Sequence, residues 1–307
     1  MRKLLVGHTG FVGSNLAAQT DFDGLYNSKN IEEAYGQGGD VLVYSGLRAE
    51  KFLANRRPDL DHDMIEQAER NIERIGCACT VFISTVDVYP DPRGVDETTP
   101  IDASELAPYG ANRLEMEGWV ARSCPRHLIV RLPALFGKNL KKNFLYDLTH
   151  PVPGMLSDEL HARLGAAEPL IERGYAQNEY GFWQLVPGAK KDGALAEAFA
   201  RADFDSKSFT DSRSRFQFFN LAHLWGLIER ALDEGIELLN VTSEPVSAAE
   251  VYAHVYGGEF VNEVAARPFD YDMRTVHAEA LGGSDGYLYD RQTVLAEIAD
   301  FLRGGAR

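Results

Sequence analysis

Cysteine and long apolar runs are scarce in this chain of 307 residues. The three cysteines, Cys77, Cys79 and Cys124, are too few and too unevenly spaced for a disulfide framework or a zinc site. No apolar run approaches the roughly 18 residues that a membrane-spanning helix needs. The chain opens on a strand pattern and not on a signal peptide. We therefore expect a soluble, cytoplasmic protein without a metal site.

Basic residues are also few, since 31 Lys and Arg stand against 46 Asp and Glu, a formal net charge of −15. A surface of this sign is a poor partner for nucleic acid or for an anionic membrane. An anionic substrate would need a local basic pocket. Hydrophobic residues make up 45% of the chain, which suits one large α/β domain or a core domain with a smaller lobe.

The start of the chain carries a glycine-rich segment. Leu4–Val6 has the apolar pattern of a buried parallel strand, and Gly7, Gly10 and Gly13 follow at three-residue steps before a helical pattern. A strand, a glycine-rich turn and a helix together cradle the pyrophosphate of a dinucleotide. The spacing is one residue wider at its first gap than the usual fingerprint. A purely structural turn is the alternative.

The next strand pattern, residues 22–26, ends at the polar trio Asn27, Ser28 and Lys29. NAD-specific sites place an acidic residue about 20 positions past the first glycine, where it holds the ribose hydroxyls. The neutral and basic trio at this place favours the 2′-phosphate of NADP over NAD, with a plain polar turn as the alternative. The connection to the following strand, residues 40–46, is short. We therefore expect one strand of the usual sheet to be missing.

A basic cluster follows that strand and comprises Arg48, Lys51, Arg56 and Arg57. Such a run usually forms a solvated face. Because this one follows the carboxyl end of an expected parallel strand, some of its members could instead face the ligand crevice.

Strand and helix patterns then alternate, with helices expected at residues 59–76 and 108–123 and strands at 80–84 and 127–132. This order predicts an α/β fold with a Rossmann-type doubly wound parallel sheet. From about residue 139 the pattern becomes irregular, which predicts a smaller, mainly helical C-terminal substrate lobe. We assign residues 1–145 plus 216–245 to the NAD(P)-binding domain and 146–215 plus 246–307 to the substrate lobe.

Two side chains on the helix at 108–123 are candidates for chemistry. Tyr109 and Arg113 are four positions apart and therefore lie on one helix face. A nearby cation lowers the pKa of a phenol, which tyrosine needs for proton exchange near neutral pH. Thr85, after the strand at 80–84, could donate a hydrogen bond to the same substrate oxygen. A structural cation–tyrosine pair is the alternative.

These segments together resemble the extended short-chain dehydrogenases/reductases. The resemblance rests on Gly7-x-x-Gly10-Phe11-x-Gly13, Ser84-Thr85-Val-Asp-Val-Tyr89 and Tyr109-x-x-x-Arg113. More narrowly, the chain is similar to the NAD-dependent epimerase/dehydratase family that acts on nucleotide sugars. Weaker similarity continues at Arg131–Gly137, Asn143-Phe144, Arg215–Leu221 and Leu239–Pro245, and it is loose between about residues 146 and 211.

The resemblance implies a role for each matching residue. Thr85 would bind the reacting oxygen, Tyr109 would be the general acid/base, and Arg113 stands where the family has the lysine that holds the nicotinamide ribose. Substrate contacts would come from Thr85, Asp87, Asn143, Arg215 and Arg267. Cofactor contacts would come from Gly7, Thr9, Gly10, Phe11, Val12, Gly13, Asn27, Ser28, Lys29, Ser45, Gly46, Leu47, Tyr109, Arg113 and Pro133. A homodimer through the helices at 59–76 and 108–123 would be expected.

Two departures from the family pattern bear on activity. Arg113 keeps the charge of the usual lysine but cannot release a proton. Val86 and Asp87 follow Thr85 in place of the Asp-Glu pair of the sugar dehydratases, which disfavours a dehydratase. The expected protein is an NAD(P)-dependent sugar reductase or epimerase. A non-catalytic NAD(P)-binding sensor or regulatory protein on the same fold is the alternative.

Overall fold

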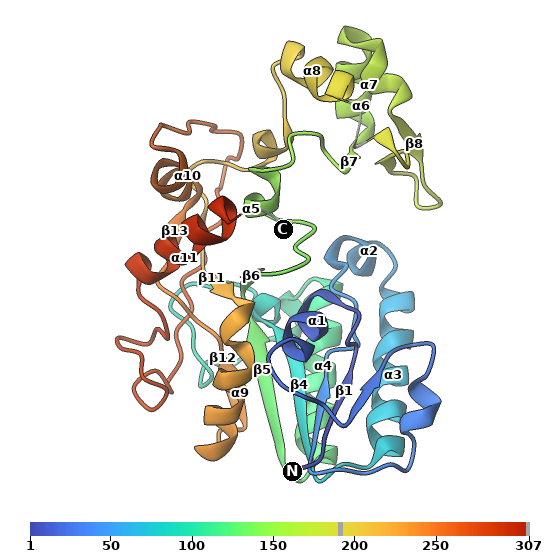
Figure 1. Ribbon diagram of the computed structural model, residues 1–307, viewed down its shortest axis with the longest axis vertical. Coiled ribbons are helices and arrows are strands. Elements are labelled where there is room, and N and C mark those ends of the chain that lie inside the picture. The colour runs from blue at the N-terminus through green and yellow to red at the C-terminus, as the bar shows by residue number, and fades with distance from the viewer. Residues whose placement is uncertain (190–192, 305–307) are drawn as a thin grey trace. The chain divides into compact units, whose positions relative to one another are not determined.

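The computed structural model describes residues 1–189 and 193–304, which form two compact units (Figure 1). Unit 1 comprises Met1–Leu140, Arg215–Val246 and the described chain from Asp270 onward. Unit 2 comprises the described residues of Lys141–Ser214 together with Ser247–Phe269. Each unit is considered by itself below.

Unit 1 is built on a parallel sheet that contains six strands among the described residues, in the order β12-β5-β4-β3-β1-β2. The strands are β1 (Lys3–Val6), β2 (Gly24–Tyr26), β3 (Val41–Tyr44), β4 (Cys79–Thr85), β5 (His127–Leu132) and β12 (Leu238–Asn240). The inner strands β3 and β5 are almost wholly buried, which explains their mostly apolar sequences. The predicted doubly wound parallel sheet is confirmed.

On one side of β1 the described sheet has a single strand, β2. Within the described sheet β2 pairs with β1 alone, and the short 3-10 helix η1 (Ile31–Ala34) leads from β2 to β3 on the other side of β1. A full helical crossover would be needed to add a further parallel strand beyond β2. The missing strand inferred from the short connection is therefore confirmed.

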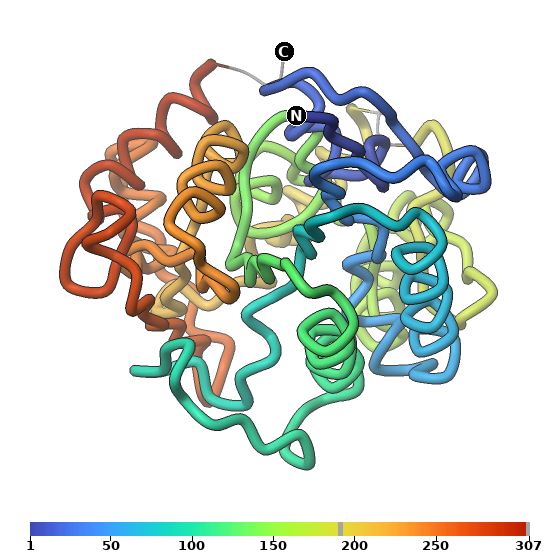
Figure 2. The backbone as a smooth tube through the Cα atoms, turned by 90° about the horizontal axis from the view of Figure 1, so that it is seen from below, coloured from blue at the N-terminus to red at the C-terminus, as the bar shows by residue number. Residues whose placement is uncertain are grey.

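Helices cover both faces of this sheet, because alternate side chains of each strand point to opposite faces. Leu4 of β1 and Leu42 of β3 belong to a core cluster that also holds Ile65 of α3 and Met116 of α4. Their neighbours on the opposite face form a second cluster with α1 and α9. The helices of unit 1, several of which are seen nearly end-on in Figure 2, are α1 (Phe11–Ala17), α2 (Lys51–Arg56), α3 (Pro58–Ile75), α4 (Pro108–Ser123), α9 (Leu224–Asp233) and α11 (Arg291–Arg303).

The shorter elements of unit 1 complete its connections. They are η2 (Val86–Val88), η3 (Ala103–Glu105), β6 (Ala134–Phe136), β10 (Arg215–Phe216), β11 (Phe218–Asn220) and η6 (Leu221–His223). β13 (Val246–Ser247) stands at the boundary of the two units. β6 and β11 pair in parallel.

The C-terminal segment corrects our domain assignment. We placed residues 246–307 in the substrate lobe, but the described residues from Asp270 onward belong to unit 1. The reason is the apolar face of α11, where the Phe301 ring lies 5.5 Å from that of Phe136. The backbone N–H of Leu288 also donates to Thr242 O. Residues 190–192 and 305–307 of the assigned lobe lie outside the described residues.

Unit 2 combines helices with a small antiparallel sheet. In the part of the chain that the structure describes, this sheet has the order β7-β9-β8. Its core includes Leu164, Ile171, Tyr175 and Phe199. The elements are α5 (Phe144–Asp147), β7 (Met155–Leu156), α6 (Asp158–Ala167), α7 (Pro169–Arg173), β8 (Tyr175–Gln177), β9 (Trp183–Leu185), α8 (Gly193–Arg201), η5 (Ser206–Phe209) and α10 (Ala248–Tyr256).

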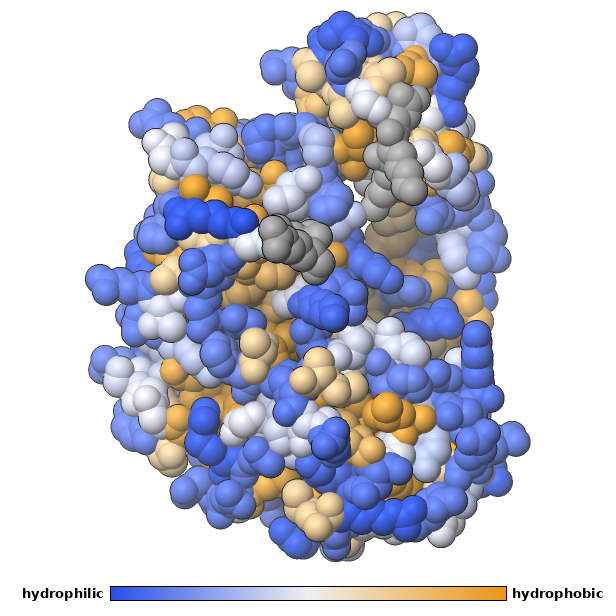
Figure 3. All heavy atoms as spheres, viewed as in Figure 1, coloured by the Kyte–Doolittle hydropathy of each residue, from blue (hydrophilic) through white to orange (hydrophobic). Residues whose placement is uncertain are grey.

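Hydrophilic side chains cover most of the molecular face in Figure 3. None of the described helices combines the length and the apolar character that crossing a membrane requires. Among residues 1–189 and 193–304 there is also no group of three or more side chains that could hold a metal ion.

The two helices expected at a dimer interface bury their apolar side chains within unit 1. Ile65, Ile72 and Ile75 of α3 and Met116 of α4 all lie in the core of the sheet. The homodimer stays a prediction. Light scattering at micromolar concentration should give twice the mass of the chain, and a monomer mass would contradict it.

Candidate active site

The glycine-rich turn has a geometry that side chains would block. Gly7 has a φ of +92°, and its N–H donates to Tyr26 O at 2.8 Å. A Cβ on Gly7 would lie 2.4 Å from Ser45 O, and one on Gly13 would lie 2.1 Å from Gly7 O. Because real Cβ atoms do not approach backbone so closely, glycine is required at both positions.

The turn leads into the N-terminus of α1, which fits a phosphate group. Gly10 is the N-cap, and in the described chain no side chain caps this helix and no acidic residue stands in its first turn. The exposed end of α1 therefore presents backbone N–H groups and the positive end of the helix dipole. Thr9, Phe11 and Val12 lie on the same turn. The residues present therefore fit the pyrophosphate of a dinucleotide.

The other predicted cofactor residues lie at the carboxyl ends of strands. Asn27, Ser28 and Lys29 follow β2, and the Asn27 side-chain oxygen accepts from Lys29 N at 2.9 Å, while Ser28 and Lys29 are exposed. Ser45, Gly46 and Leu47 follow β3, and Pro133 follows β5. The strand order reverses at β1, so this edge of the sheet is the crevice where doubly wound folds bind ligands.

Thr85 and Asp87 occupy the turn at the end of β4. The Thr85 hydroxyl caps η2 by accepting from the Asp87 N–H at 3.2 Å. The Asp87 carboxylate in turn accepts a hydrogen bond from Lys51 Nζ at 2.7 Å. The Asp87 carboxylate is therefore held in place by the ammonium group of Lys51.

Our sequence analysis did not identify Lys51 as a residue of the site. It appeared there as one of four members of the basic cluster. The signal available was its place after the end of β3, at the same edge of the sheet as Thr85.

Tyr109 lies in the first turn of α4, where two contacts fix it. Its backbone N–H donates to the side-chain oxygen of Asn55 on α2 at 2.9 Å. A Cβ on the adjacent Gly110 would lie 2.3 Å from Asp87 O, so α4 packs directly on the turn that follows β4. These contacts bring the first turn of α4, which carries Tyr109, next to the turn that holds Asp87.

The ionisation of Tyr109 differs from our prediction. Burial raises the pKa of the phenol above its ordinary value, and the nearby carboxylates of Asp87 and Asp61 add to the rise. The cations Arg113 and Lys51 act in the lowering direction without overcoming burial. The expectation that Arg113 would bring the pKa of Tyr109 below its free value is therefore wrong for the protein without its ligands.

Arg113 forms a buried ion pair with Asp61 of α3. Its two terminal nitrogens donate to the two carboxylate oxygens at 2.9 and 3.0 Å, and both side chains are about 3% exposed. One of these nitrogens also donates to Arg48 O at 2.9 Å. The guanidinium carbon lies 4.6 Å from the centre of the Tyr109 ring, so the cation stands over the ring. This arrangement matches the structural cation–tyrosine pair that we gave as the alternative.

The predicted substrate residues are divided between the units. Arg215 lies in unit 1, where it contacts Asp270 at 3.1 Å and Asp272 at 4.0 Å. Asn143 lies in unit 2, has a φ of +108° and caps α5 by accepting from Tyr146 N. Arg267 is an exposed residue of unit 2. The role of all three in binding a substrate stays a prediction.

A buried polar network connects the strands that carry the site and was not foreseen. Arg131 of β5 donates to the Glu117 carboxylate of α4 at 2.6 Å and to the Tyr89 hydroxyl at 2.7 Å. Ser84 of β4 donates to the same carboxylate, and Asn240 of β12 donates to Tyr89 at 2.9 Å. Every charge in it is paired, as burial requires. The network fixes α4 against the sheet through Glu117.

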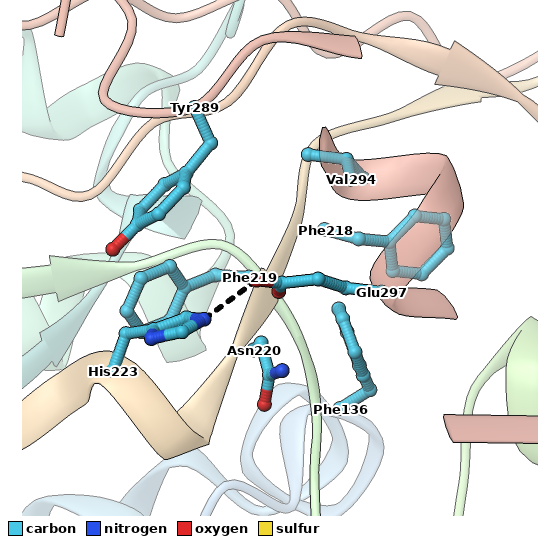
Figure 4. Close-up of a pocket in the computed structure, with 8 residues that line it drawn as sticks. All are labelled: Phe136, Phe218, Phe219, Asn220, His223, Tyr289, Val294 and Glu297. Carbon is cyan, nitrogen blue, oxygen red and sulfur yellow. Dashed lines mark hydrogen bonds and ion pairs between the residues drawn. The ribbon is translucent and has the colours of Figure 1, made fainter. Parts of the chain in front are cut away.

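A separate pocket in unit 1 contains none of the predicted site residues. As Figure 4 shows, it is lined by aromatic side chains around a hydrogen bond between His223 and Glu297, whose Nε2 and Oε1 atoms are 2.7 Å apart. The Tyr289 ring stacks on His223 with centroids 5.5 Å apart. The side chains of α11, η6, β6 and β11 pack together here and leave little open space.

Comparison with known proteins places the fold. No protein-family model matches the chain, and no curated protein matches it. Among solved structures it is similar to the dTDP-4-dehydrorhamnose reductase of Yersinia enterocolitica, with 14% identity over 99% of each chain and a TM-score of 0.64. It is also similar to the dTDP-4-dehydrorhamnose reductase of Bacillus anthracis in complex with NADP, with 16% identity over 99% of each chain and a TM-score of 0.59. A third similar structure is the UDP-glucose 4-epimerase of Thermotoga maritima with UDP-glucose, with 11% identity over 100% of each chain and a TM-score of 0.61.

These likenesses extend over the whole length of each chain, while the sequences have diverged far. Identities of 11% to 16% with TM-scores of 0.59 to 0.64 establish a shared architecture and not a shared activity. The protein therefore has the Rossmann-type α/β fold of nucleotide-sugar reductases and epimerases.

Proposed function

We propose that this protein is an NAD(P)-dependent oxidoreductase or epimerase of the extended short-chain dehydrogenase/reductase type that acts on a sugar or nucleotide sugar. The observation that carries the proposal is the placement of Tyr109 beside the Thr85–Asp87 turn, at the sheet edge where the glycine turn ends β1. The similar folds of an NADP-bound reductase and a UDP-glucose-bound epimerase support it.

The chemistry divides between cofactor and protein. The dinucleotide, when held at the glycine turn, supplies or accepts the hydride. The Thr85 hydroxyl positions the substrate oxygen, and the Tyr109 hydroxyl exchanges its proton with that oxygen. Because burial raises the pKa of Tyr109, the phenol is protonated near neutral pH. That is the state needed to protonate the oxygen of a carbonyl undergoing reduction.

Dehydration has less support. Elimination of water needs an acid and a base near the substrate. Val86 is buried, and the carboxylate of Asp87 is held by Lys51. This matches the sequence departure from the Asp-Glu pair of the dehydratases.

A non-catalytic dinucleotide sensor is the second candidate. The observation that favours it is the burial of Arg113 against Asp61, which ties up the charge that stands in the lysine position. Thermal-shift screening with NAD(H), NADP(H) and nucleotide sugars tests the dinucleotide site common to both candidates, because ligands that bind the native state raise Tm. Turnover separates them: a sensor would bind the dinucleotide without consuming it, and an enzyme would reduce or epimerise a sugar.

The cofactor preference gives a sharper test of the turn after β2. We expect NADPH to bind more tightly than NADH, because Lys29 is exposed beside the glycine turn and is a cation for the 2′-phosphate. In Lys29→Ala, NADPH affinity should fall about tenfold, because a charge-assisted hydrogen bond contributes about 1.5 kcal/mol. NADH affinity should stay unchanged, as measured by calorimetry.

The matched control is Lys141→Ala, which removes the same charge from an exposed position of unit 2. It should leave both affinities unchanged. Tighter binding of NADH than of NADPH would contradict the preference, and binding of neither would contradict the proposed function.

A further inference from the structure

We propose that the aromatic rings of Phe216 and Tyr271 hold the sugar ring of the substrate by stacking, on the side of the site next to Thr85. This inference rests on the proposed function and goes further, because it names the part of the substrate that is recognised and the side chains that recognise it. Neither aromatic residue was among those predicted to bind a substrate.

The two rings lie on a short ladder of extended chain in unit 1. Residues 270–272 pair in parallel with Arg215 of β10 on one side and with Arg93 on the other. The backbone N–H of Tyr271 donates to Arg215 O at 3.2 Å. Because the chain is extended here, successive side chains point to opposite faces of the ladder.

One face of the ladder carries charges that pair with one another. The guanidinium of Arg215 lies 3.1 Å from the Asp270 carboxylate and 4.0 Å from that of Asp272. The guanidinium of Arg274 lies 3.4 Å from Asp272. Arg215 therefore has its carboxylate partners on the face that is opposite to the rings.

The other face of the ladder is aromatic. The ring centroids of Phe216 and Tyr271 are 6.3 Å apart and the angle between the ring planes is 22°, so the two rings stack. Both side chains are half-buried, which leaves part of their surface open to a ligand. Phe218, which is buried, lies behind Phe216 with the ring centroids 5.6 Å apart. The core of unit 1 therefore supports the pair.

The aromatic face borders the candidate site. Tyr271 packs against a cluster of buried residues that includes Val86, the residue directly after Thr85. Burial is the largest cause of the raised pKa of the Tyr271 phenol, and the nearby charges of Asp87 and Lys51 also act on it. Packing and charge thus both place this ring beside the turn at the end of β4.

A sugar ring suits this position better than a nucleobase does. In the proposed reaction the reacting carbon belongs to the sugar and must lie at Thr85 and Tyr109, whereas the diphosphate separates the base from that carbon. The apolar face of a pyranose consists of C–H groups, which pack on an aromatic ring by dispersion and by attraction to its π electrons. Ligand pockets commonly combine such aromatic walls with a few polar groups, and Thr85 and Tyr109 are the polar groups here.

The test compares a nucleotide sugar with the same nucleotide lacking its sugar. The probes are UDP-glucose with UDP and dTDP-glucose with dTDP, and calorimetry in the presence of NADPH measures their affinities. One of the two nucleotide sugars should bind the wild-type protein more tightly than its nucleotide. In Tyr271→Leu and in Phe216→Leu, which keep an apolar side chain of similar bulk, that advantage should fall roughly three- to tenfold, because an aromatic contact is lost.

Two further variants separate stacking from other effects. Tyr271→Phe keeps the ring and should retain the wild-type ratio of the two affinities. Arg215→Met, on the charged face, should also retain it, because any contact with the diphosphate is common to both ligands. NADPH affinity should stay at the wild-type value in every variant, which shows that the fold is intact.

The outcomes distinguish this inference from the function on which it rests. A ratio that stays at the wild-type value in both leucine variants would overturn the inference. A wild-type protein that binds NADPH but neither nucleotide sugar would also overturn it. Absence of binding of both NADPH and NADH would instead overturn the proposed function.

Discussion

Replacement of Tyr109 by phenylalanine is expected to abolish turnover and to leave the fold and cofactor affinity nearly intact. The change removes one hydroxyl from a side chain that is 6% exposed, so the ring keeps its packing. The backbone N–H of residue 109 still donates to Asn55. A positioned general acid accelerates a reaction by roughly 10²- to 10⁴-fold, so kcat should fall by about that factor. Steady-state kinetics and calorimetry with NADPH measure the two quantities.

Tyr271→Phe is the matched control for this variant. Tyr271 is a second half-buried phenol close to Lys51 and Asp87, and burial raises its pKa also. Loss of its hydroxyl should change kcat little if Tyr109 alone is the acid. Full activity in Tyr109→Phe would show that the assignment is wrong, and Asp87 would become the next candidate.

Loss of the Arg113 side chain is expected to be the most destabilising single change at the site. Arg113→Met leaves the Asp61 carboxylate buried with its ionic partner removed, although Asn112 still donates to it at 2.9 Å. Breaking one side of a buried pair costs about 3–5 kcal/mol, so the free energy of unfolding should fall by that amount in urea titrations. Arg113→Lys should lose less, because it keeps the charge but not the two-pronged contact.

A double variant separates this structural role from a catalytic one. Arg113→Met/Asp61→Leu should regain most of the stability, because an apolar replacement removes the unpaired charge. A single variant that unfolds like the wild-type protein but fails to bind NADPH would instead support the family role for Arg113.

The fold was predictable where local signals and burial agree. The helix expected at residues 108–123 is α4 itself, because Pro108 fits the first turn. The strand expected at 127–132 is β5, whose apolar residues Leu128–Val130 are buried in the sheet. The place of residues 270–307 was not predictable, because it depends on contacts of α11 with strands far away in sequence.

The sequence predicted which residues of the strand ends and turns lie at the candidate site. It did not predict which charged side chains pair with one another there. The spacing of Tyr109 and Arg113 correctly placed both on one face of a helix. It carried no information about Asp61, which lies 52 positions earlier on another helix and takes the charge of Arg113. Lys51 was likewise only one of four members of a basic cluster. The packing of α2 decides that this member reaches Asp87.

The shortened side of the sheet has a consequence for how the protein behaves at high concentration. An edge strand offers unpaired backbone groups on which another chain can add a strand and begin to aggregate. Here the edge is β2, which is only three residues long and is followed at once by the polar turn of Asn27 to Lys29. So short a template gives an incoming strand few hydrogen bonds. We infer that leaving out the outer strand also protects this edge against aggregation.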